Sequence, residues 1–443
     1  MKMKFVLLIF LIYFAVMVWI LYFSLQLSLF VTPVSKHEES QPIYFRKEFS
    51  EAGHDLQGSA TLRPGMVMLL SLYAHLPSVT EKYSSISKYL IHFIEKMKKD
   101  ITVRGVAKDP WELAREWATP NSLVPETAPG LGDILAALST APIVSAAPAV
   151  GGSQFKIILW LEGKQKVVLA PKIHSLDSIL IGKNRGGDRH NGEIVAFHLG
   201  RLLGLQMTPI AVGRKVSLKR EILPVATQRL AETFSKNKNG DTCFYGICRY
   251  CKPQWRVCAV QDTLSCAVIM WLPEHLSILE IDHPWRDNKK NVLARWEYDE
   301  NYCQEVLVGD QGGKILDIID VSVLDYIIQN TDRHNAVYIA GEPDSSFVPI
   351  DNGKSFGDPH TDYTDMLAPV LQCCRIRQAT YERLVLLSGG GMSLALQELL
   401  ALDPVAPVLT PAHLRATDRR VTHLLAALSA CSVKKGGWHN VLF

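Results

Sequence analysis

Residues 330–357 read NTDRHNAVYIAGEPDSSFVPIDNGKSFG, and two carboxylates in this stretch, Asp332 and Asp351, organise the rest of the chain. Asp332 follows an apolar segment over 315–328, whose spacing predicts a buried helix. Asp351 follows a short strand-like run over 347–350 and is followed directly by turn residues. A polar loop, a strand and then Asp-Asn-Gly would therefore present both acids to one site.

Two acids at one site are typical of a phosphotransferase. One acid orients or deprotonates the acceptor hydroxyl, and the other holds the metal that bridges the nucleotide phosphates. In the alternative reading, Asp332 pairs with Arg333 at a surface turn and Asp351 only makes an Asx-turn. The local pattern leaves both readings open, and the rest of the chain favours the first.

Length and charge limit the class of protein. The chain has 443 residues, 48% of them apolar, which is enough for one large domain or two lobes with an ample core. The formal net charge is only +3. A nucleic-acid binder would show a concentrated basic stripe, so we expect no nucleic-acid partner.

The N-terminus predicts a membrane anchor. Lys2 and Lys4 precede an uncharged apolar run over 5–25, and about 20 apolar residues can cross a bilayer as a helix. A cleaved signal peptide, the alternative, would have a shorter apolar core and small residues before a cleavage site. By the positive-inside rule we predict a cytoplasmic tail over 1–4, a signal anchor over 5–25 and a lumenal stem over 26–105.

Residues 154–173 predict a β-hairpin, with strands FKIILWL and KVVLAPK joined by the turn EGKQ. The sequence GDRHNGEIVAFHL follows over 187–199, with Asp188 at the start of a predicted helix and Glu193 inside it. A strand pair followed by a helix with a buried acid is typical of the small lobe of a kinase. The alternative takes Asp188 as a helix cap and Glu193 as a solvated charge.

All nine cysteines follow residue 242. Four lie in the segment 243–258, CFYGICRYCKPQWRVC, which is compatible with a zinc site or with disulfides. An oxidising lumen favours disulfides. Eight cysteines form four bonds, so we predict Cys266, beside the apolar strand over 267–272, as the free thiol. The spacing alone does not fix the pairing.

Taken together, the motifs resemble a known family, the secretory-pathway atypical kinases that include the Golgi casein kinase and the glycosaminoglycan xylosylkinase. The resemblance covers about 110–431, and PWELAREW, ARWEYDE and KSFG are closer to the xylosylkinase branch. It rests on the motifs DRHNGEIVAFHL, CFYGICRYC, MWLP, HPWR, ARWEYDENYC, NTDRH, DNGKSFG and PVLQCCRIR.

The resemblance implies an α+β fold, an atypical two-lobed kinase with a small β-rich N-lobe over 106–272 and a larger helical C-lobe over 273–443. It implies Asp332 as the catalytic residue and Asp188 and Asp351 as metal ligands. The nucleotide contacts that it implies are Gln154, Glu193, Ile269, Met270, Trp271, Leu272 and Asp351. The disulfides that it implies are Cys243–Cys258, Cys248–Cys251, Cys303–Cys373 and Cys374–Cys431.

Two positions depart from the family pattern. The lysine that neutralises nucleotide phosphate and pairs with the helix glutamate is replaced by Ala170, and an acid five residues after Asp332 is replaced by Val337. Without a cation, Glu193 would be a costly buried carboxylate. Side chains two apart on a strand share a face, so we expect Lys172 to reach into the gap and join the nucleotide-binding residues.

Two functions follow from the resemblance. The first is an ATP-dependent kinase, using Mn²⁺ or Mg²⁺, that phosphorylates xylose in the glycosaminoglycan–protein linkage region of proteoglycans. The retained acids favour it. The second is a catalytically impaired pseudokinase that acts as a scaffold or activator of a secretory-pathway kinase, and the loss of two nucleotide contacts favours it. Phosphorylation of secreted proteins is a third, weaker reading.

The resemblance also implies a location. We expect a single-pass type II protein of the Golgi membrane, with the catalytic body in the lumen or released from it, and a kinase of the same family as a possible partner.

Overall fold

The computed structural model describes residues 62–105, 108–149, 151–286 and 292–443. Within these ranges, no helix combines the length and the apolar character needed to cross a membrane. The predicted tail over 1–4, the predicted anchor over 5–25 and the first part of the predicted stem lie outside the described residues.

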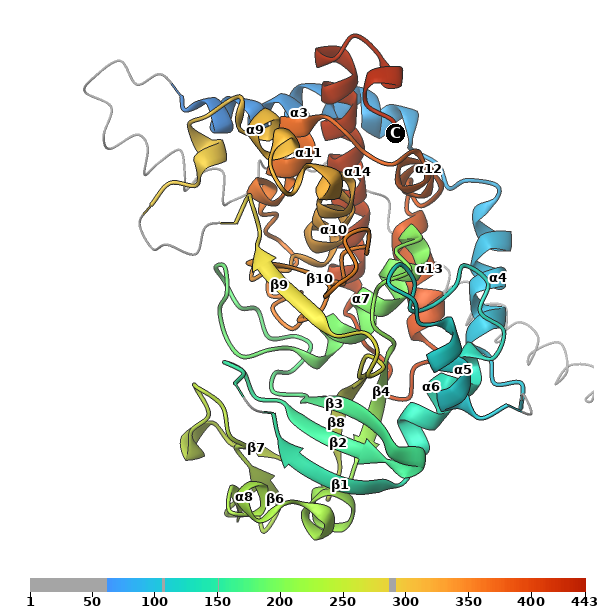
Figure 1. The fold of residues 1–443 in the computed structure, drawn as a ribbon, viewed down its shortest axis with the longest axis vertical. Helices are drawn as coiled ribbons and strands as arrows, with labels where there is room; N and C mark the ends of the chain where they lie inside the picture. Colours follow the sequence, from blue (N-terminus) through green and yellow to red (C-terminus); the bar gives the residue numbers. More distant parts are fainter. Residues whose placement is uncertain (1–61, 106–107, 150, 287–291) are drawn as a thin grey trace, which may run out of the picture. The chain divides into compact units, whose positions relative to one another are not determined.

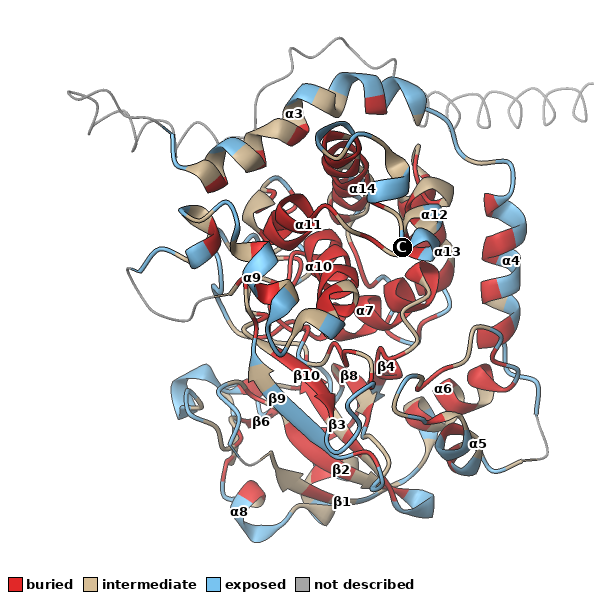
Figure 2. Cartoon of the chain, turned by 45° about the horizontal axis from the view of Figure 1, so that its top comes forward, coloured by how far each residue is buried: buried red, intermediate tan, exposed pale blue. Residues whose placement is uncertain are grey.

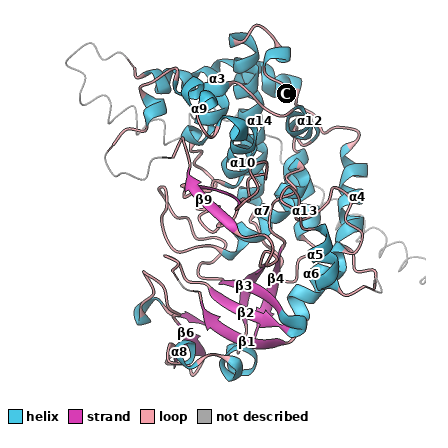
Figure 3. Cartoon of the chain, in the orientation of Figure 1, coloured by secondary structure: helices cyan, strands magenta, loops and turns pink. Residues whose placement is uncertain are grey.

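A five-stranded antiparallel sheet forms the small lobe (Figure 1), with its strands in the order β1-β2-β3-β8-β4. The predicted hairpin is confirmed, because β2 and β3 pair from Ile157 opposite Leu169 to Leu161 opposite Gln165. Figure 3 shows these strands gathered at one end of the folded body and most helices at the other. The strand bounds are Ile143–Pro148 for β1, Ile157–Leu161 for β2, Gln165–Pro171 for β3, Ala211–Val216 for β4 and Leu264–Met270 for β8.

Helix α7 joins the two lobes. It spans His190–Leu203, every one of its residues is buried, and it packs on β4 and β8 on one side and on α10 and α13 on the other. The reading of Glu193 as a solvated charge is therefore wrong. The helix begins two residues after Asp188, and the N-cap position is occupied by Arg189, with no side-chain hydrogen bond to the helix. The reading of Asp188 as the cap is therefore wrong as well.

The large lobe is built around helix α10, Ile315–Ile328, which is buried along nearly its whole length. This confirms the helix predicted over 315–328, and Figure 2 shows the buried α10 surrounded by other helices. The surrounding helices are α9 (Tyr302–Val308), α11 (Ala368–Cys373), α12 (Gln378–Leu386), α13 (Gly391–Leu400) and α14 (Pro411–Lys434).

A two-stranded sheet lies between the lobes, formed by β9 (Ile278–Asp282) and β10 (Asn335–Ile339). The run over 347–350 is not a strand, although we predicted one. Val348 donates to the carbonyl of Val337, but Pro349 has no N–H, and Ile350 donates back to Val348. The chain therefore bends immediately before Asp351.

The described part of the predicted stem is packed on the large lobe. Helix α3, Pro64–Lys82, lies along α14, and α4, Leu90–Ile101, lies along α13. Lys98 forms an ion pair of 2.6 Å with Glu398. Residues 64–101 thus belong to the folded body, because their apolar faces are covered by helices of the large lobe.

The four predicted disulfides are present, and Cys266 is free and buried as predicted. The zinc alternative is therefore wrong. Cys243 and Cys258 face each other across β6 and β7, Cys303–Cys373 links α9 to α11, and Cys374–Cys431 links α11 to α14. The remaining elements are β5 (Phe234–Lys236), β6 (Thr242–Phe244), β7 (Val257–Cys258), α5 (Pro110–Trp117), α6 (Leu131–Thr140) and α8 (Gln228–Ala231).

Candidate active site

A buried ion pair to helix α10 fixes the loop that carries Asp332. Arg333 donates from Nε to Asp325 Oδ2 and from Nη2 to Asp325 Oδ1, both at 3.0 Å, and both side chains are almost fully buried. The same guanidinium donates to the carbonyl of Ile350 and to Oδ1 of Asn352, at 2.6 Å for Asn352. Arg333 therefore joins helix α10 to the segment around Asp351, and the reading of Arg333 as the surface partner of Asp332 is wrong.

Asn352 connects this segment to helix α7. Its backbone N–H donates to Glu193 Oε1 and its side-chain amide donates to Glu193 Oε2, each at 3.1 Å. The amide also donates to the carbonyl of Pro349 at 2.9 Å. Asp351, just before it, has a φ of 60°, which turns the chain sharply at this point. The carboxylate of Asp351 hydrogen-bonds Lys156, so the reading that Asp351 only makes an Asx-turn is wrong.

Gly353 allows Asp188 to approach. A Cβ atom at position 353 would lie 2.5 Å from Cγ of Asp188, a distance that side chains do not tolerate. The backbone here also accepts a hydrogen bond of 2.8 Å from the N–H of Arg189. The glycine thus brings a buried carboxylate of the small lobe against the turn that carries Asp351.

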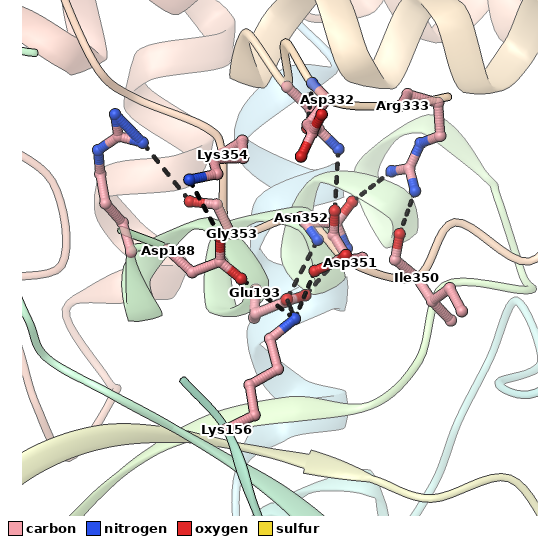
Figure 4. A network of polar contacts seen from close by, with 12 residues as sticks. Lys156, Asp188, Glu193, Asp332, Arg333, Ile350, Asp351, Asn352, Gly353 and Lys354 are labelled. Carbon is pink, nitrogen blue, oxygen red and sulfur yellow. Dashed lines mark hydrogen bonds and ion pairs between the residues drawn. The ribbon is translucent and has the colours of Figure 1, made fainter. Parts of the chain in front are cut away.

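Lys156, just before β2, reaches the three carboxylates from the sheet (Figure 4). Its Nζ hydrogen-bonds Asp351 and lies 3.3 Å from Oδ2 of Asp188 and 3.7 Å from Oε1 of Glu193. Asp188 and Glu193 are buried, whereas 59% of the Asp351 side chain is exposed. One ammonium group therefore lies between two buried acids and one open acid.

The pKa shifts follow from this arrangement. Burial raises the pKa of both Asp188 and Glu193, against the opposing effect of the positive charge of Lys156. The charge of Lys156 lowers the pKa of Asp351. Burial lowers the pKa of Lys156, but the charges of the three acids outweigh it and raise that pKa overall. The amine is thus held in its charged form.

Asp332 lies on the side of the cluster away from Lys156 (Figure 4). About a third of its side chain is exposed, and burial raises its pKa. Asn330 ties it to the second acid, because its Oδ1 accepts from the N–H of Asp332 and its Nδ2 donates to the carbonyl of Asp351. Nδ1 of His334 donates to the carbonyl of Asp332 over 2.7 Å. The structure thus brings together Asp332, Asp351, Asp188 and Glu193, which were all selected from the sequence.

Lys172 is not the cation that contacts Glu193, contrary to our expectation. Among the described residues, the only ion pair of Glu193 is with Lys156. The charge of Lys172 acts instead on His190, where burial and this charge lower the imidazole pKa to about 4. The signal for Lys156 was in the hairpin itself, since the register places it beside the position of Ala170.

The other predicted nucleotide contacts stay predictions. Gln154 lies in the segment before β2 and is half-buried. Ile269 and Met270 end β8, and Lys166 lies over the ring of the partly exposed Trp271, with Nζ 3.6 Å from its centroid. Leu272 follows directly in the sequence.

Val337, the second departure from the family pattern, is buried in β10. An apolar side chain at this position cannot supply the charge of the acid that it replaces.

The acidic residues fit a divalent metal that is shared with phosphate. Within the described ranges, no group of three or more His, Cys, Asp or Glu side chains forms a complete metal site. Asp188 Oδ2 is nevertheless buried and makes no hydrogen bond within these ranges, and Asp351 faces the same Lys156 from the open side. Mg²⁺ and Mn²⁺ bind carboxylate oxygens, and one or two such ligands are enough when nucleotide phosphates supply the rest.

Comparisons with known proteins give the same family as the motifs. The family described as "Golgi casein kinase, C-terminal, Fam20" matches residues 109–440. The glycosaminoglycan xylosylkinase of Homo sapiens is 43% identical over 335 residues, which is 74% of this chain and 82% of that protein.

Solved structures agree. A hydra Fam20 structure with sugar aligns with a TM-score of 0.73 and 39% identity, over 76% of this chain and 98% of that one. The Golgi casein kinase with Mn/ADP bound aligns with a TM-score of 0.71 and 24% identity, over 93% of this chain and 96% of that one, and this likeness supports the fold alone. The mixed α/β fold is therefore kinase-like, and the chain belongs to the Fam20 family of Golgi casein kinase-like proteins.

Proposed function

We propose that this protein is a phosphotransferase that moves the γ-phosphoryl group of ATP to a hydroxyl of xylose in the glycosaminoglycan–protein linkage region. The observation that carries the proposal is the gathering of Asp188 and Asp351 around Lys156 at the junction of the lobes, with Asp332 tied to Asp351 through Asn330. The similarity to glycosaminoglycan xylosylkinases supports the sugar as acceptor over a protein side chain.

In the proposed step, the acceptor hydroxyl lies against Asp332. Its oxygen attacks the γ-phosphorus, the bond from the γ-phosphorus to the β–γ bridging oxygen breaks, and ADP leaves. The proton of the hydroxyl passes to the carboxylate of Asp332. The raised pKa of this carboxylate makes it a better proton acceptor, and the partial exposure of the side chain leaves room for the sugar.

Asp188 and Asp351 would hold the divalent metal. When bound, Mn²⁺ or Mg²⁺ neutralises charge on the phosphate oxygens. Gly353 leaves room for Asp188 at this position, and the bend before Asp351 positions the second carboxylate. The two carboxylates therefore reach the site from different lobes. Glu193 is held by Asn352 and does not need the metal as a partner.

The experiment that tests the proposal is transfer of labelled phosphate from ATP to a xylose-containing linker glycan, with Mn²⁺ present. A casein-type peptide, offered in parallel, tests phosphorylation of proteins. We expect the glycan to be phosphorylated and the peptide to be left unmodified. Labelled peptide and unlabelled glycan would move the proposal to the protein-kinase reading.

Ala170 and Val337 favour a second candidate, a pseudokinase that activates another secretory kinase. In that case the protein would give no transfer to either acceptor, but would raise the activity of a family kinase added to it. The four disulfides suit the oxidising lumen that both candidates need. We include in the proposal a Golgi location with a lumenal body, which protease protection of the full-length protein in sealed membranes would test.

We predict an acid limb in the pH profile that comes from Asp332. Burial, reinforced by the negative charge of Asp351 and opposed by His334, raises the pKa of Asp332. Only the deprotonated carboxylate can accept the proton, so kcat/KM should be lost as the pH falls through this raised pKa. A profile that stays flat down to the ordinary pKa range of aspartate would contradict the role of Asp332.

Gly353→Ala should weaken metal binding. The new Cβ would lie 2.5 Å from Cγ of Asp188 and would push this carboxylate out of place. We expect a loss of about 10- to 100-fold in Mn²⁺ affinity, measured by calorimetry with ADP present. Gly313→Ala is the matched control, because a Cβ there meets nothing within 4 Å. Equal affinities in the two variants would show that Asp188 does not bind the metal.

A further inference from the structure

Lys156 and Ala170 lie next to each other at the end of the small-lobe hairpin. The last pair of the antiparallel ladder is Ile157 with Leu169, and Lys156 and Ala170 are the next residues outward from that pair. Residues directly opposite in such a ladder project from the same face, with Cβ atoms about 5 Å apart. A lysine side chain that starts from either position can therefore reach the same space.

In the family pattern, a lysine at position 170 would pair with Glu193. Lys156 makes this contact in its place. Its ammonium lies 3.7 Å from Oε1 of Glu193 and 3.3 Å from Oδ2 of Asp188, and it hydrogen-bonds Asp351. No other cation in the described part of the chain forms an ion pair with Glu193. Because Glu193 is almost fully buried, loss of this cation would leave an uncompensated charge in the interior.

We propose that Lys156 supplies, from the neighbouring strand, the positive charge that Ala170 cannot supply, as partner of Glu193 and as ligand of the nucleotide phosphate. One ammonium then serves three carboxylates in the nucleotide-free protein and turns to the phosphates when nucleotide enters. The phosphate contact rests on the proposed function, whereas the pairing with Glu193 is independent of it.

This role reconciles the two readings that the sequence left open. The absence of a lysine at position 170 favoured a pseudokinase, but the charge has moved to another strand and is still present at the site. Electrostatic stabilisation by one placed cation is a large contribution in phosphoryl transfer. The site therefore keeps a positive group for the phosphates despite Ala170.

The test relocates the lysine in the purified full-length protein. Lys156→Met should lower the Tm of the metal- and nucleotide-free protein by about 5 °C, because Glu193 and Asp188 lose their cation. It should also lower phosphate transfer by about 100-fold or more. The double variant Lys156→Met/Ala170→Lys should recover most of both losses. Lys215→Met, in the exposed part of β4, is the control and should change neither quantity.

Methionine is an unbranched side chain that keeps most of the packing of lysine and removes its charge, so a loss in Lys156→Met separates a placed charge from a packing role. A folded double variant that recovers neither quantity would overturn the proposal. The proposal would also be overturned if Lys172→Met lowered the Tm and phosphate transfer while Lys156→Met changed neither. So would a tenfold gain in transfer from Ala170→Lys alone, which would show that the charge had been missing.

Binding of a fluorescent ADP analogue separates this proposal from the proposed function, because it needs no acceptor. Lys156→Met should bind the analogue at least tenfold more weakly than the wild type. If the wild type binds nucleotide and modifies no glycan, while Lys156→Met binds weakly, the function is wrong and the role of Lys156 stands. If glycan is modified and Lys156→Met binds and transfers normally, the role of Lys156 is wrong and the function stands.

Discussion

Asp332→Asn is expected to lower kcat for phosphate transfer by about 1,000-fold, with little change in the KM for ATP. The amide keeps the size of the side chain and cannot accept the proton of the acceptor hydroxyl. Asp332 lies on the side of the cluster away from Lys156 and is not among the acids that Lys156 contacts, so nucleotide binding should persist. Steady-state kinetics with a linker glycan, together with nucleotide binding, would measure both quantities.

The control for this variant is Asp344→Asn, an identical chemical change at an exposed aspartate in the loop before residue 347. It should transfer phosphate at the wild-type rate. If Asp332→Asn loses nucleotide affinity in proportion to kcat, the residue binds nucleotide and is not the proton acceptor. If it keeps the full rate, another group takes the proton and the proposed step is wrong.

Residues with a local signal were predictable from the sequence. The apolar spacing over 315–328 predicted the buried helix α10, and two apolar runs joined by the turn EGKQ predicted the hairpin of β2 and β3. Asp332 follows α10, so the helix located it, whereas Asp351 was selected after the run over 347–350, which is not a strand. The disulfide pairing had no local signal, and only the family resemblance implied it.

Long-range contacts were harder to predict. The choice of Lys172 rested on the side-chain period of one strand, whereas the cation came from Lys156 on the strand next to it. A cross-strand argument from the register would have found Lys156, since Ala170 lies next to it at the end of the hairpin. The alternative reading placed Arg333 at the surface, because nothing near it in the sequence shows that helix α10 carries its buried partner.

Asp325, one of three buried aspartates in helix α10, was the available signal for that partner. A buried acid needs a cation, and Arg333 provides it for Asp325, together with the bonds to Ile350 and Asn352. The same ion pair therefore stabilises the large lobe and positions the loops that carry Asp332 and Asp351. These two consequences can be measured separately.

Arg333→Met is expected to lower the free energy of unfolding by about 3 to 5 kcal/mol, because it leaves Asp325 buried without a cation. The double variant Arg333→Met/Asp325→Leu removes both charges and should regain much of this loss. It should not regain activity, since Ile350 and Asn352 still lack the donor that fixes the turn before Gly353. Denaturant unfolding and phosphate transfer, measured on the same preparations, would test both expectations.

Glu398→Gln is the control for the stability measurement, because its ion pair with Lys98 is partly exposed and should contribute about 1 kcal/mol or less. A double variant that is stable and fully active would show that Arg333 matters only for stability. A stable and inactive double variant would show that the guanidinium positions the site as well. We expect the second result, since the guanidinium that neutralises Asp325 is also the donor that Asn352 and Ile350 share.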